Sequence, residues 1–283
     1  MIPSKFTYHK PTSIKDAVAL LAAHGDDSKI LAGGHSLVPV LKLRLNDPEH
    51  LIDITGIEAL GGIRDNEKSI TIGANATHGE IARNAALKEH APMVALAASM
   101  IGDVQVRNFG TIGGSIAHAD PAADWPAVLL AADANVVISN ANGSRTVDID
   151  QFFKGLFMTA LGEEEIITAI SIPKTAFNKN STYVKFPQPA SRFALVGCAA
   201  AVANTDGYVT EARVAFSGVS ATPFRDTNVE KSLKGSVLNG DSIATSTASV
   251  ADGVSVMSDH FAAEKYRKHM AGVYARKALS ALA

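Results

Sequence analysis

The chain has 283 residues, with 26 basic and 28 acidic side chains and a formal net charge of −2 at pH 7. This near balance argues against a nucleic-acid or membrane-surface binder, because both bind through a marked excess of basic groups. The composition, 47% hydrophobic and 19% charged, suits a globular protein with a substantial core. The longest apolar stretch, "AVLLAADANVVI", is interrupted by Asp133 and Asn135 and is too short to span a membrane. The N-terminal segment lacks the apolar core of a signal peptide, so we expect a cytoplasmic location.

One cysteine, Cys198, is present. A single thiol can form no internal disulfide and cannot supply the ligands of an iron–sulfur cluster or a structural zinc site. Its setting, "LVGCAAAVA", predicts a buried small hydrophobic side chain. The nine histidines show no spacing such as H-E-x-x-H, so the sequence predicts no metal site.

The first region, residues 1–56, has the pattern of a β-α-β unit. "TSIKDAVALLAAHG" predicts a helix with Thr12 or Ser13 as N-cap and Gly25 just after its end. "KILAGG" and "HLIDIT" read as short buried strands, and the segment between them is long enough for a crossover in a parallel sheet.

The second region, residues 57–176, mixes strands and helices. "SITIGANA", "NVVIS" and "EEIITAISIP" predict strands of a mixed or antiparallel sheet. "THGEIARNAALKEH" predicts one helix with a capping box made by Thr77 and Glu80, and "PMVALAASM" a second helix opened by Pro92.

The third region, residues 177–283, changes character. "STYVKF", "RFALVGCAAAVAN" and "VTEARVAFSGV" predict long strands, and Asp206-Gly207 predicts a tight hairpin between the last two. After Pro223 the pattern becomes helical, which favours a small α+β domain.

Two glycine-rich segments are the candidate ligand-binding loops: "ILAGGHSLVP" and "NFGTIGGSIAHADPAAD". Each combines adjacent glycines with a hydroxyl side chain, so successive backbone N–H groups could converge on an anion such as a pyrophosphate. Neither is a P-loop or a Rossmann G-x-G-x-x-G sequence. The alternative is two tight turns whose glycines supply only positive φ angles.

Two acidic residues follow the second loop. The sequence "HADPAADWPAVLL" predicts a helix with Asp120 as N-cap, Pro121 at its first position and Asp124 in its first turn. Both carboxylates would then interact favourably with the positive N-terminal end of the helix dipole. The other interpretation gives Asp124 a ribose hydroxyl to bind, as acidic residues do in other dinucleotide sites.

Three segments of the sequence resemble those of a known protein family. "ILAGGHSLVPVLKLRL", "VRNFGTIGGSIAHADPAADWPAVLLAADA" and "YVKFPQPASRFALVGCAAAV" are similar to the FAD-binding medium subunit of molybdenum hydroxylases, the family of carbon monoxide and xanthine dehydrogenases. The resemblance covers essentially the whole chain. It implies an α+β fold with an α/β start, namely a vanillyl-alcohol-oxidase-type FAD-binding fold of two α/β subdomains (residues 1–56 and 57–176) plus a C-terminal α+β domain (177–283) with an antiparallel sheet and helices.

The resemblance also implies where FAD binds. The first loop would lie on one side of the pyrophosphate and the second on the other, Asp124 would contact ribose or adenosine, and Lys185 would lie near the flavin ring. Ile101 and Leu161 would pack on flavin or adenine, Phe193 is a candidate for shielding the flavin face, and His35 and His118 would shape their loops. The expected cofactor-binding residues are Ile30, Leu31, Ala32, Gly33, Gly34, His35, Ser36, Leu37, Ile101, Thr111, Ile112, Gly113, Gly114, Ser115, His118, Asp120, Asp124, Leu161, Lys185 and Phe193.

The implied function is electron transfer, with no catalytic residue in this chain. Because one cysteine cannot ligate [2Fe-2S] clusters, these and the molybdopterin cofactor would belong to an iron–sulfur small subunit and a molybdenum large subunit, in a dimer of heterotrimers. FAD would pass electrons to a quinone, NAD or oxygen. Two alternatives stay open: a stand-alone flavin-dependent oxidoreductase of related fold, and a nucleotide-binding module without redox activity.

Overall fold

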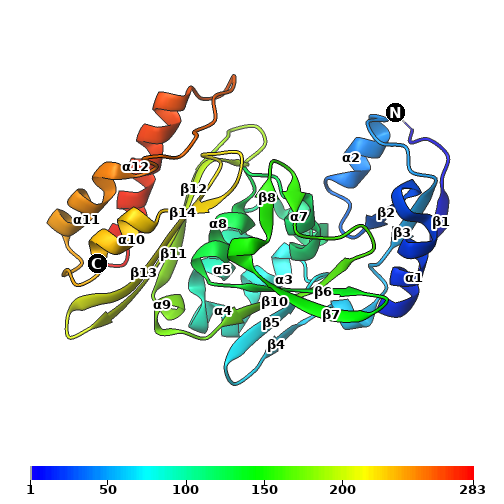
Figure 1. Cartoon of the computed structure of the whole chain (residues 1–283), viewed down its shortest axis with the longest axis horizontal. Coiled ribbons are helices and arrows are strands. Elements are labelled where there is room, and N and C mark those ends of the chain that lie inside the picture. Colours follow the sequence, from blue (N-terminus) through cyan, green and yellow to red (C-terminus); the bar gives the residue numbers. More distant parts are fainter. Residues whose placement is uncertain (1) are drawn as a thin grey trace.

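Three large sheets follow one another along the chain in the computed structural model, which describes residues 2–283. The N-terminal sheet lies at one end of the long axis and the C-terminal helices at the other, with the second sheet between them (Figure 1). The two chain termini therefore lie near opposite ends of the molecule.

The N-terminal sheet is parallel and has the order β1 (Thr7–His9), β3 (His50–Asp53), β2 (Ser28–Leu31). Helix α1 (Ile14–His24) begins at Ser13, whose Oγ accepts the Asp16 N–H at 3.1 Å, and ends before Gly25 at φ +48°. It buries Ala17, Val18 and Leu21 in a cluster that includes Ile52. The predicted β-α-β unit is confirmed, with β1 as a strand that the pattern did not predict. Helix α2 (Leu37–Lys42) follows the first glycine loop.

The second sheet is antiparallel throughout, in the order β4 (Ile63–Asp65), β5 (Ser69–Gly73), β10 (Ile166–Pro173), β6 (Asn135–Asn140), β7 (Gly143–Asp148). Six helices lie between β5 and β6 in the chain: α3 (His78–Arg83), α4 (Ala85–His90), α5 (Pro92–Met100), α6 (Val104–Phe109), α7 (Ile112–His118) and α8 (Asp124–Ala131). A short hairpin of β8 (Phe153–Gly155) and β9 (Met158–Thr159) follows β7.

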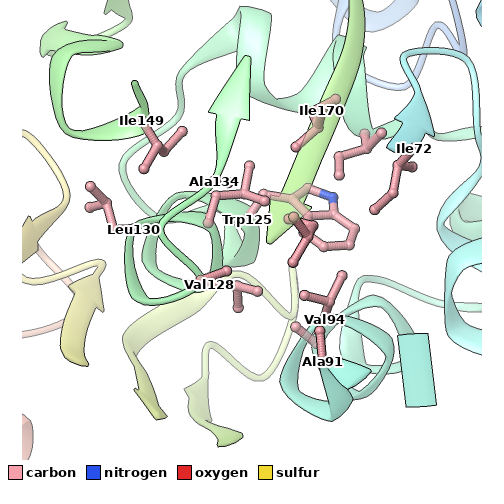
Figure 2. Packing of buried hydrophobic residues seen from close by; sticks show 14 of the residues in the cluster. Ile72, Ala91, Val94, Trp125, Val128, Leu130, Ala134, Ile149 and Ile170 are labelled. Atoms are coloured by element: carbon pink, nitrogen blue, oxygen red, sulfur yellow. The ribbon is translucent and has the colours of Figure 1, made fainter. Parts of the chain in front are cut away.

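Trp125, the only tryptophan of the chain, is fully buried between this sheet and its helices. Figure 2 shows its indole beside Ile72 and Ile170 from the sheet and Val94 from α5. The indole N–H donates to His78 Nδ1 at 3.2 Å, so the one polar atom of this side chain has a partner.

The helix predicted over residues 77–90 is two helices. The capping box of Thr77 and Glu80 is confirmed, but Asn84 leaves the helix with φ −65° and ψ 126°. Its Oδ1 accepts the Leu87 N–H at 3.0 Å and so begins α4. A side chain that can cap a new helix competes locally with continuing the old one.

The C-terminal sheet is antiparallel, in the order β11 (Ser181–Pro187), β12 (Ala194–Thr205), β13 (Tyr208–Ser217), β14 (Phe224–Arg225). The predicted hairpin is confirmed, because Asp206 and Gly207 both have positive φ angles, +52° and +84°. The helices of this region are α9 (Ala176–Lys179), α10 (Thr227–Leu233), α11 (Gly240–Ser246) and α12 (Glu264–Ser280).

Strand β12 is buried on both faces, which explains its unbroken apolar sequence. Cys198 and Ala200 face the cluster that includes α10, α11 and α12, whereas Ala199 and Ala201 belong to the cluster around Trp125. Small side chains let helices pack closely on each face. Cys198 is fully buried, as predicted, and this burial raises the pKa of its thiol.

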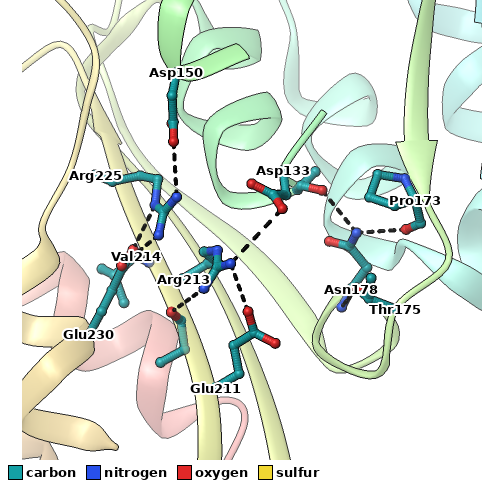
Figure 3. A network of polar contacts seen from close by, with 12 residues as sticks. Asp133, Asp150, Pro173, Thr175, Asn178, Glu211, Arg213, Val214, Arg225 and Glu230 are labelled. Carbon is teal, nitrogen blue, oxygen red and sulfur yellow. Dashed lines mark hydrogen bonds and ion pairs between the residues drawn. The ribbon is translucent and has the colours of Figure 1, made fainter. Parts of the chain in front are cut away.

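Polar contacts also cross from the second region to the C-terminal sheet (Figure 3). Arg225 pairs with Glu230 at 2.8 Å and reaches Asp150 at 3.2 Å, and Arg213 lies 3.9 Å from Asp133. The backbone is joined as well, since the Ala194 N–H donates to the carbonyl of Ala122 at 3.0 Å.

Among residues 2–283, no helix has the length and apolar character needed to cross a membrane.

Candidate functional site: a cavity between two glycine loops

A cavity of about 580 Å³ lies where the three regions meet. Its wall includes the loop after β2, the turn between α5 and α6, the start of α7, the segment leading into β10 and the turn between β11 and β12. The volume falls in the usual range for small-molecule and cofactor sites, about 300–1,000 Å³. The third region contributes residues 191–193 to the wall, among them Phe193, which the resemblance had placed at the site.

The two glycines of the first loop serve different purposes. Gly34 has a φ of +74°, a conformation that other residues adopt only with strain. A Cβ on Gly33 would lie 2.1 Å from the carbonyl oxygen of Phe109 and 2.8 Å from the Cα of Gly110. Gly33 is therefore needed because the second loop packs directly against the first.

The first loop carries a run of free backbone donors. Among residues 2–283, no protein acceptor is found for the N–H groups of Gly33, Gly34, His35, Ser36 and Leu37. These residues line the cavity. Backbone N–H groups require a partner when they are covered, so a ligand with several anionic oxygens fits this segment.

The second loop differs from this expectation, because most of its backbone donors are already used. The N–H groups of Ile112 and Gly113 donate to the carbonyls of Ala76 and Ala74 at 3.1 and 2.9 Å, and that of Gly114 to Thr111 Oγ1 at 3.2 Å. A Cβ on Gly113 would lie 2.7 Å from Ala74. This loop therefore builds the wall mainly through close packing and offers the ligand its hydroxyl groups.

Of the two acidic residues after this loop, Asp124 lies in the first turn of a helix, as predicted, but Asp120 does not cap that helix. Helix α8 begins at Asp124, not at Pro121, and its N-cap is Ala123. Asp120 caps only a turn, accepting the Ala122 N–H at 2.8 Å. The extended conformation of Ala123 is what delays the helix.

Asp124 lies at the cavity wall but is buried and already paired. One of its oxygens accepts a hydrogen bond from the hydroxyl of Tyr183, and Lys185 Nζ lies 3.0 Å from the carboxylate. Burial raises the pKa of Asp124, while the Lys185 charge and the Tyr183 hydrogen bond act against this effect. Burial, together with the Asp124 charge, raises the pKa of Tyr183.

Lys185 does not line the cavity. Its side chain is only 5% exposed, and Nζ donates to the carbonyl of Met100 at 2.8 Å as well as to Asp124. The amino group of Lys185 is therefore engaged by Asp124 and Met100, and its expected position near a flavin ring stays a prediction.

Two arginines hold the turn that presents Ile101 to the cavity. Arg107 donates to the carbonyls of Ile101 and Gly102 at 3.0 and 3.1 Å, and Arg192 donates to the same Gly102 carbonyl at 3.0 Å. Next to Arg192, Phe193 is 42% exposed and lines the wall. The turn is thus held from both α6 and the C-terminal region.

The sequence analysis did not single out two polar residues of the wall. His78 is 4% exposed, and burial, with the nearby charges of His35 and Arg107, lowers its pKa to about 4. Asn75 donates through its amide to the Ile54 carbonyl at 2.6 Å, but its buried Oδ1 has no partner among residues 2–283. In the sequence "GANATHGE", Asn75 precedes the capping box of Thr77 and Glu80 and His78 lies within it, so only a structural role was evident.

The predicted cofactor residues converge on this one cavity, with three exceptions. Three predicted residues lie outside the wall: Leu31, Ile112 and Lys185. Leu31 belongs to strand β2, Ile112 is buried at the start of α7, and Lys185 is held by Asp124. The predicted residues that do line it are Ile30, Ala32, Gly33, Gly34, His35, Ser36, Leu37, Ile101, Thr111, Gly113, Gly114, Ser115, His118, Asp120, Asp124, Leu161 and Phe193.

The chain is similar to known proteins in both sequence and fold. Residues 4–175 match the family described as FAD binding domain in molybdopterin dehydrogenase, and residues 181–282 match the CO dehydrogenase flavoprotein C-terminal domain. The chain belongs to this FAD-binding family. The fold is accordingly the α+β FAD-binding fold expected from the resemblance.

Relatives of this FAD-binding family match the chain along nearly its whole length. The carbon monoxide dehydrogenase medium chain of Hydrogenophaga pseudoflava is 38% identical, over 99% of this chain and 98% of that protein. The glyceraldehyde dehydrogenase medium chain of Sulfolobus acidocaldarius is 36% identical, with 100% of both chains covered.

Solved structures of related oxidoreductases have the same fold as this chain. Carbon monoxide dehydrogenase from Hydrogenophaga pseudoflava, in a form lacking the Mo-pyranopterin moiety, superposes with a TM-score of 0.95 at 38% identity, over 100% of this chain and 98% of that one. Quinoline 2-oxidoreductase from Pseudomonas putida 86 gives a TM-score of 0.94 at 27% identity, over 100% and 98%.

Proposed function

We propose that this chain is the FAD-carrying subunit of a molybdenum-containing oxidoreductase and that it passes electrons from iron–sulfur clusters on a partner chain to an external acceptor. The observation that carries the proposal is the run of unpartnered N–H groups at residues 33–37, on the wall of a cavity of suitable size in a member of an FAD-binding family. Bound FAD would supply the capacity to take up two electrons and release them.

The residues of this chain would hold and orient that cofactor. The N–H groups of Gly33 to Leu37 would donate to the pyrophosphate, and the Thr111 and Ser115 hydroxyls would add donors from the facing loop. Ile101, in the turn held by Arg107 and Arg192, would present an apolar surface to a ring. Asn75 Oδ1 would accept a hydrogen bond from the cofactor and so gain the partner it lacks.

Partner chains follow from the cysteine content and from the relatives. The single thiol, buried in β12, cannot ligate a cluster, so the clusters and the molybdopterin would be held by a small and a large subunit. Support comes from two relatives that are named medium chains of dehydrogenases, a name that implies further chains in those enzymes. A dimer of heterotrimers in the cytoplasm stays a prediction, as do the three domain boundaries.

The loop assignment is tested by titrating FAD into the full chain. We expect Gly34→Ala to weaken FAD binding at least tenfold, because φ +74° is strained for alanine and the loop would change its path. Gly253→Ala is the matched control: its φ is +78°, and nothing lies within 4 Å of the added Cβ. Unchanged FAD affinity in Gly34→Ala, or an equal loss in Gly253→Ala, would contradict the assignment.

A stand-alone flavin oxidoreductase is the competing function. The purified FAD-loaded chain would be assayed with carbon monoxide, aldehydes and N-heterocycles, alone and after co-expression with its partner chains. We expect the assembly to turn over an organic or gaseous substrate. The chain alone should do no more than transfer electrons from NADH to artificial acceptors. Turnover of an organic substrate by the single chain would favour the competing function.

A further inference from the structure

Three histidines that are distant in the sequence meet at the N-terminal sheet. His9 ends β1, His24 ends α1 and His50 begins β3, and these elements lie together at the blue end of the chain in Figure 1. The sequence showed no ligand spacing because the three residues are brought together only by the β-α-β fold. None of them lines the FAD cavity.

The three imidazole rings lie close enough together for one ring nitrogen of each to share a small space. One nitrogen from each ring lies within 4.8 Å of the other two. His9 Nε2 and His50 Nδ1 are 2.9 Å apart, and the rings of His24 and His50 are stacked with centroids 3.6 Å apart. All three side chains are half-buried, so an ion can reach them from solvent.

We propose that His9, His24 and His50 form a binding site for a divalent transition-metal ion of the zinc type. Neutral imidazole is a preferred ligand of zinc, copper and nickel, and three histidines with one open position make a common zinc set. A zinc–nitrogen distance of about 2.0–2.1 Å places tetrahedral ligand atoms about 3.3 Å apart. Bringing ligand atoms from at most 4.8 Å to this separation requires movements of at most about 1.5 Å, with the stacked His24 and His50 rings turning about their side-chain bonds.

Two acidic residues follow His24 closely in the chain. The carboxylate of Asp27 lies close enough to act electrostatically on His24, and Asp26 precedes it in the turn after α1. Water would complete the coordination. Each neutral ring offers one lone pair and keeps its proton on the other nitrogen. In the hydrogen bond between His9 and His50 one of the two facing nitrogens carries the proton, so that ring must move its proton to its other nitrogen, through solvent, before it binds metal.

Bound metal would join helix α1 to two strands of the N-terminal sheet, β1 and β3. His50 pairs with Thr7 of β1 and with Ser28 of β2, at the edge where β2 and β3 begin. The glycine loop leaves from the other end of β2. The site is thus separate from the cavity but is built on the same strands.

Zinc titration of the full chain, freed of any affinity tag, tests the proposal. We expect one zinc ion per chain, a rise in Tm of about 2–4 °C at tenfold excess over Kd, and at least a tenfold weaker affinity in His24→Ala and in His50→Ala. His269→Ala, on the exposed face of α12, is the matched control and should bind zinc as the unaltered chain does. Cobalt in place of zinc should give the visible absorption of a four-coordinate nitrogen site.

Two outcomes would overturn the proposal. One is no saturable zinc binding by the unaltered chain, which would mean that the histidines form only a stacked, hydrogen-bonded cluster. The other is zinc binding that survives in His24→Ala and His50→Ala, which would place the ion elsewhere. Unfolding curves recorded in EDTA show whether each variant is folded, so a folding defect cannot be mistaken for a lost ligand. Zinc binding is measured without FAD, so its failure is distinct from failure of the proposed flavin function.

Discussion

Asp124, Tyr183 and Lys185 form a buried polar group beside the cavity, and each depends on the other two. The carboxylate and the ammonium are both 5% exposed, and Tyr183 is fully buried. A buried charge is costly without its partner, so these side chains act as one unit. This unit fixes the start of α8 to strand β11.

Removing Lys185 should therefore affect folding first. We expect Lys185→Met to lower the free energy of unfolding by about 3 kcal/mol, because Asp124 would stay buried with only Tyr183 as partner. Urea denaturation followed by Trp125 fluorescence measures the change. Adding Asp124→Asn should recover part of the loss, and a change below about 1 kcal/mol in Lys185→Met would contradict the ion-pair interpretation.

His78 should make the stability of the chain without cofactor dependent on pH. Its folded-state pKa of about 4 lies below the ordinary value of 6.5, so between these values the unfolded chain takes up a proton that the folded chain does not. The contribution of His78 to the free energy of unfolding is complete above pH 6.5 and is lost as the pH falls toward 4. The total loss is about 3 kcal/mol.

The matched variants for this prediction are His78→Gln and His269→Gln. Glutamine keeps an acceptor for the Trp125 indole N–H but does not titrate, so unfolding of His78→Gln should vary less between pH 7 and 4.5. His269→Gln, on the surface of α12, should keep the pH dependence of the unaltered chain. Equal pH dependence in all three proteins would refute the prediction.

At the scale of elements, the two glycine loops depend on direct contact with each other. We expect Gly33→Ala to separate them, because its Cβ would lie 2.1 Å from a carbonyl oxygen that cannot rotate away as a side chain would. FAD affinity should fall at least tenfold, measured by the quenching of flavin fluorescence. Gly240→Ala, with nothing within 4 Å of its added Cβ, should leave the affinity unchanged.

Local sequence rules predicted the elements whose ends are fixed by their own residues. Ser13 and Gly25 fix α1, and Asp206-Gly207 fixes the β12–β13 hairpin. The rules placed Asp124 in the first turn of a helix but could not predict its ion pair, because its partner Lys185 lies sixty-one residues away. The cavity residues followed from the glycine loops and the family resemblance. His78 and the three-histidine cluster did not, because their neighbours come from separate elements.

At the scale of the whole molecule, the cavity joins all three regions, so cofactor binding should stabilise them together. FAD at about a hundred times its Kd should add about 2.7 kcal/mol to the free energy of unfolding. Thermal unfolding followed both by Trp125 fluorescence and by circular dichroism should shift upward to the same extent. A shift seen by one probe and not the other would show that the regions unfold independently.

The order in which the wall appears along the chain has a consequence for biosynthesis. The lining residues extend from Lys29 to Phe193, and residues 191–193 are held in place by β12, which ends only at Thr205. A nascent chain still attached to the ribosome at the end of the second sheet thus lacks a complete wall. At about 5–20 residues per second, translating the 32 residues between Pro173 and Thr205 takes roughly two to six seconds more before the binding site can exist. Flavin insertion must therefore wait until most of the polypeptide has emerged.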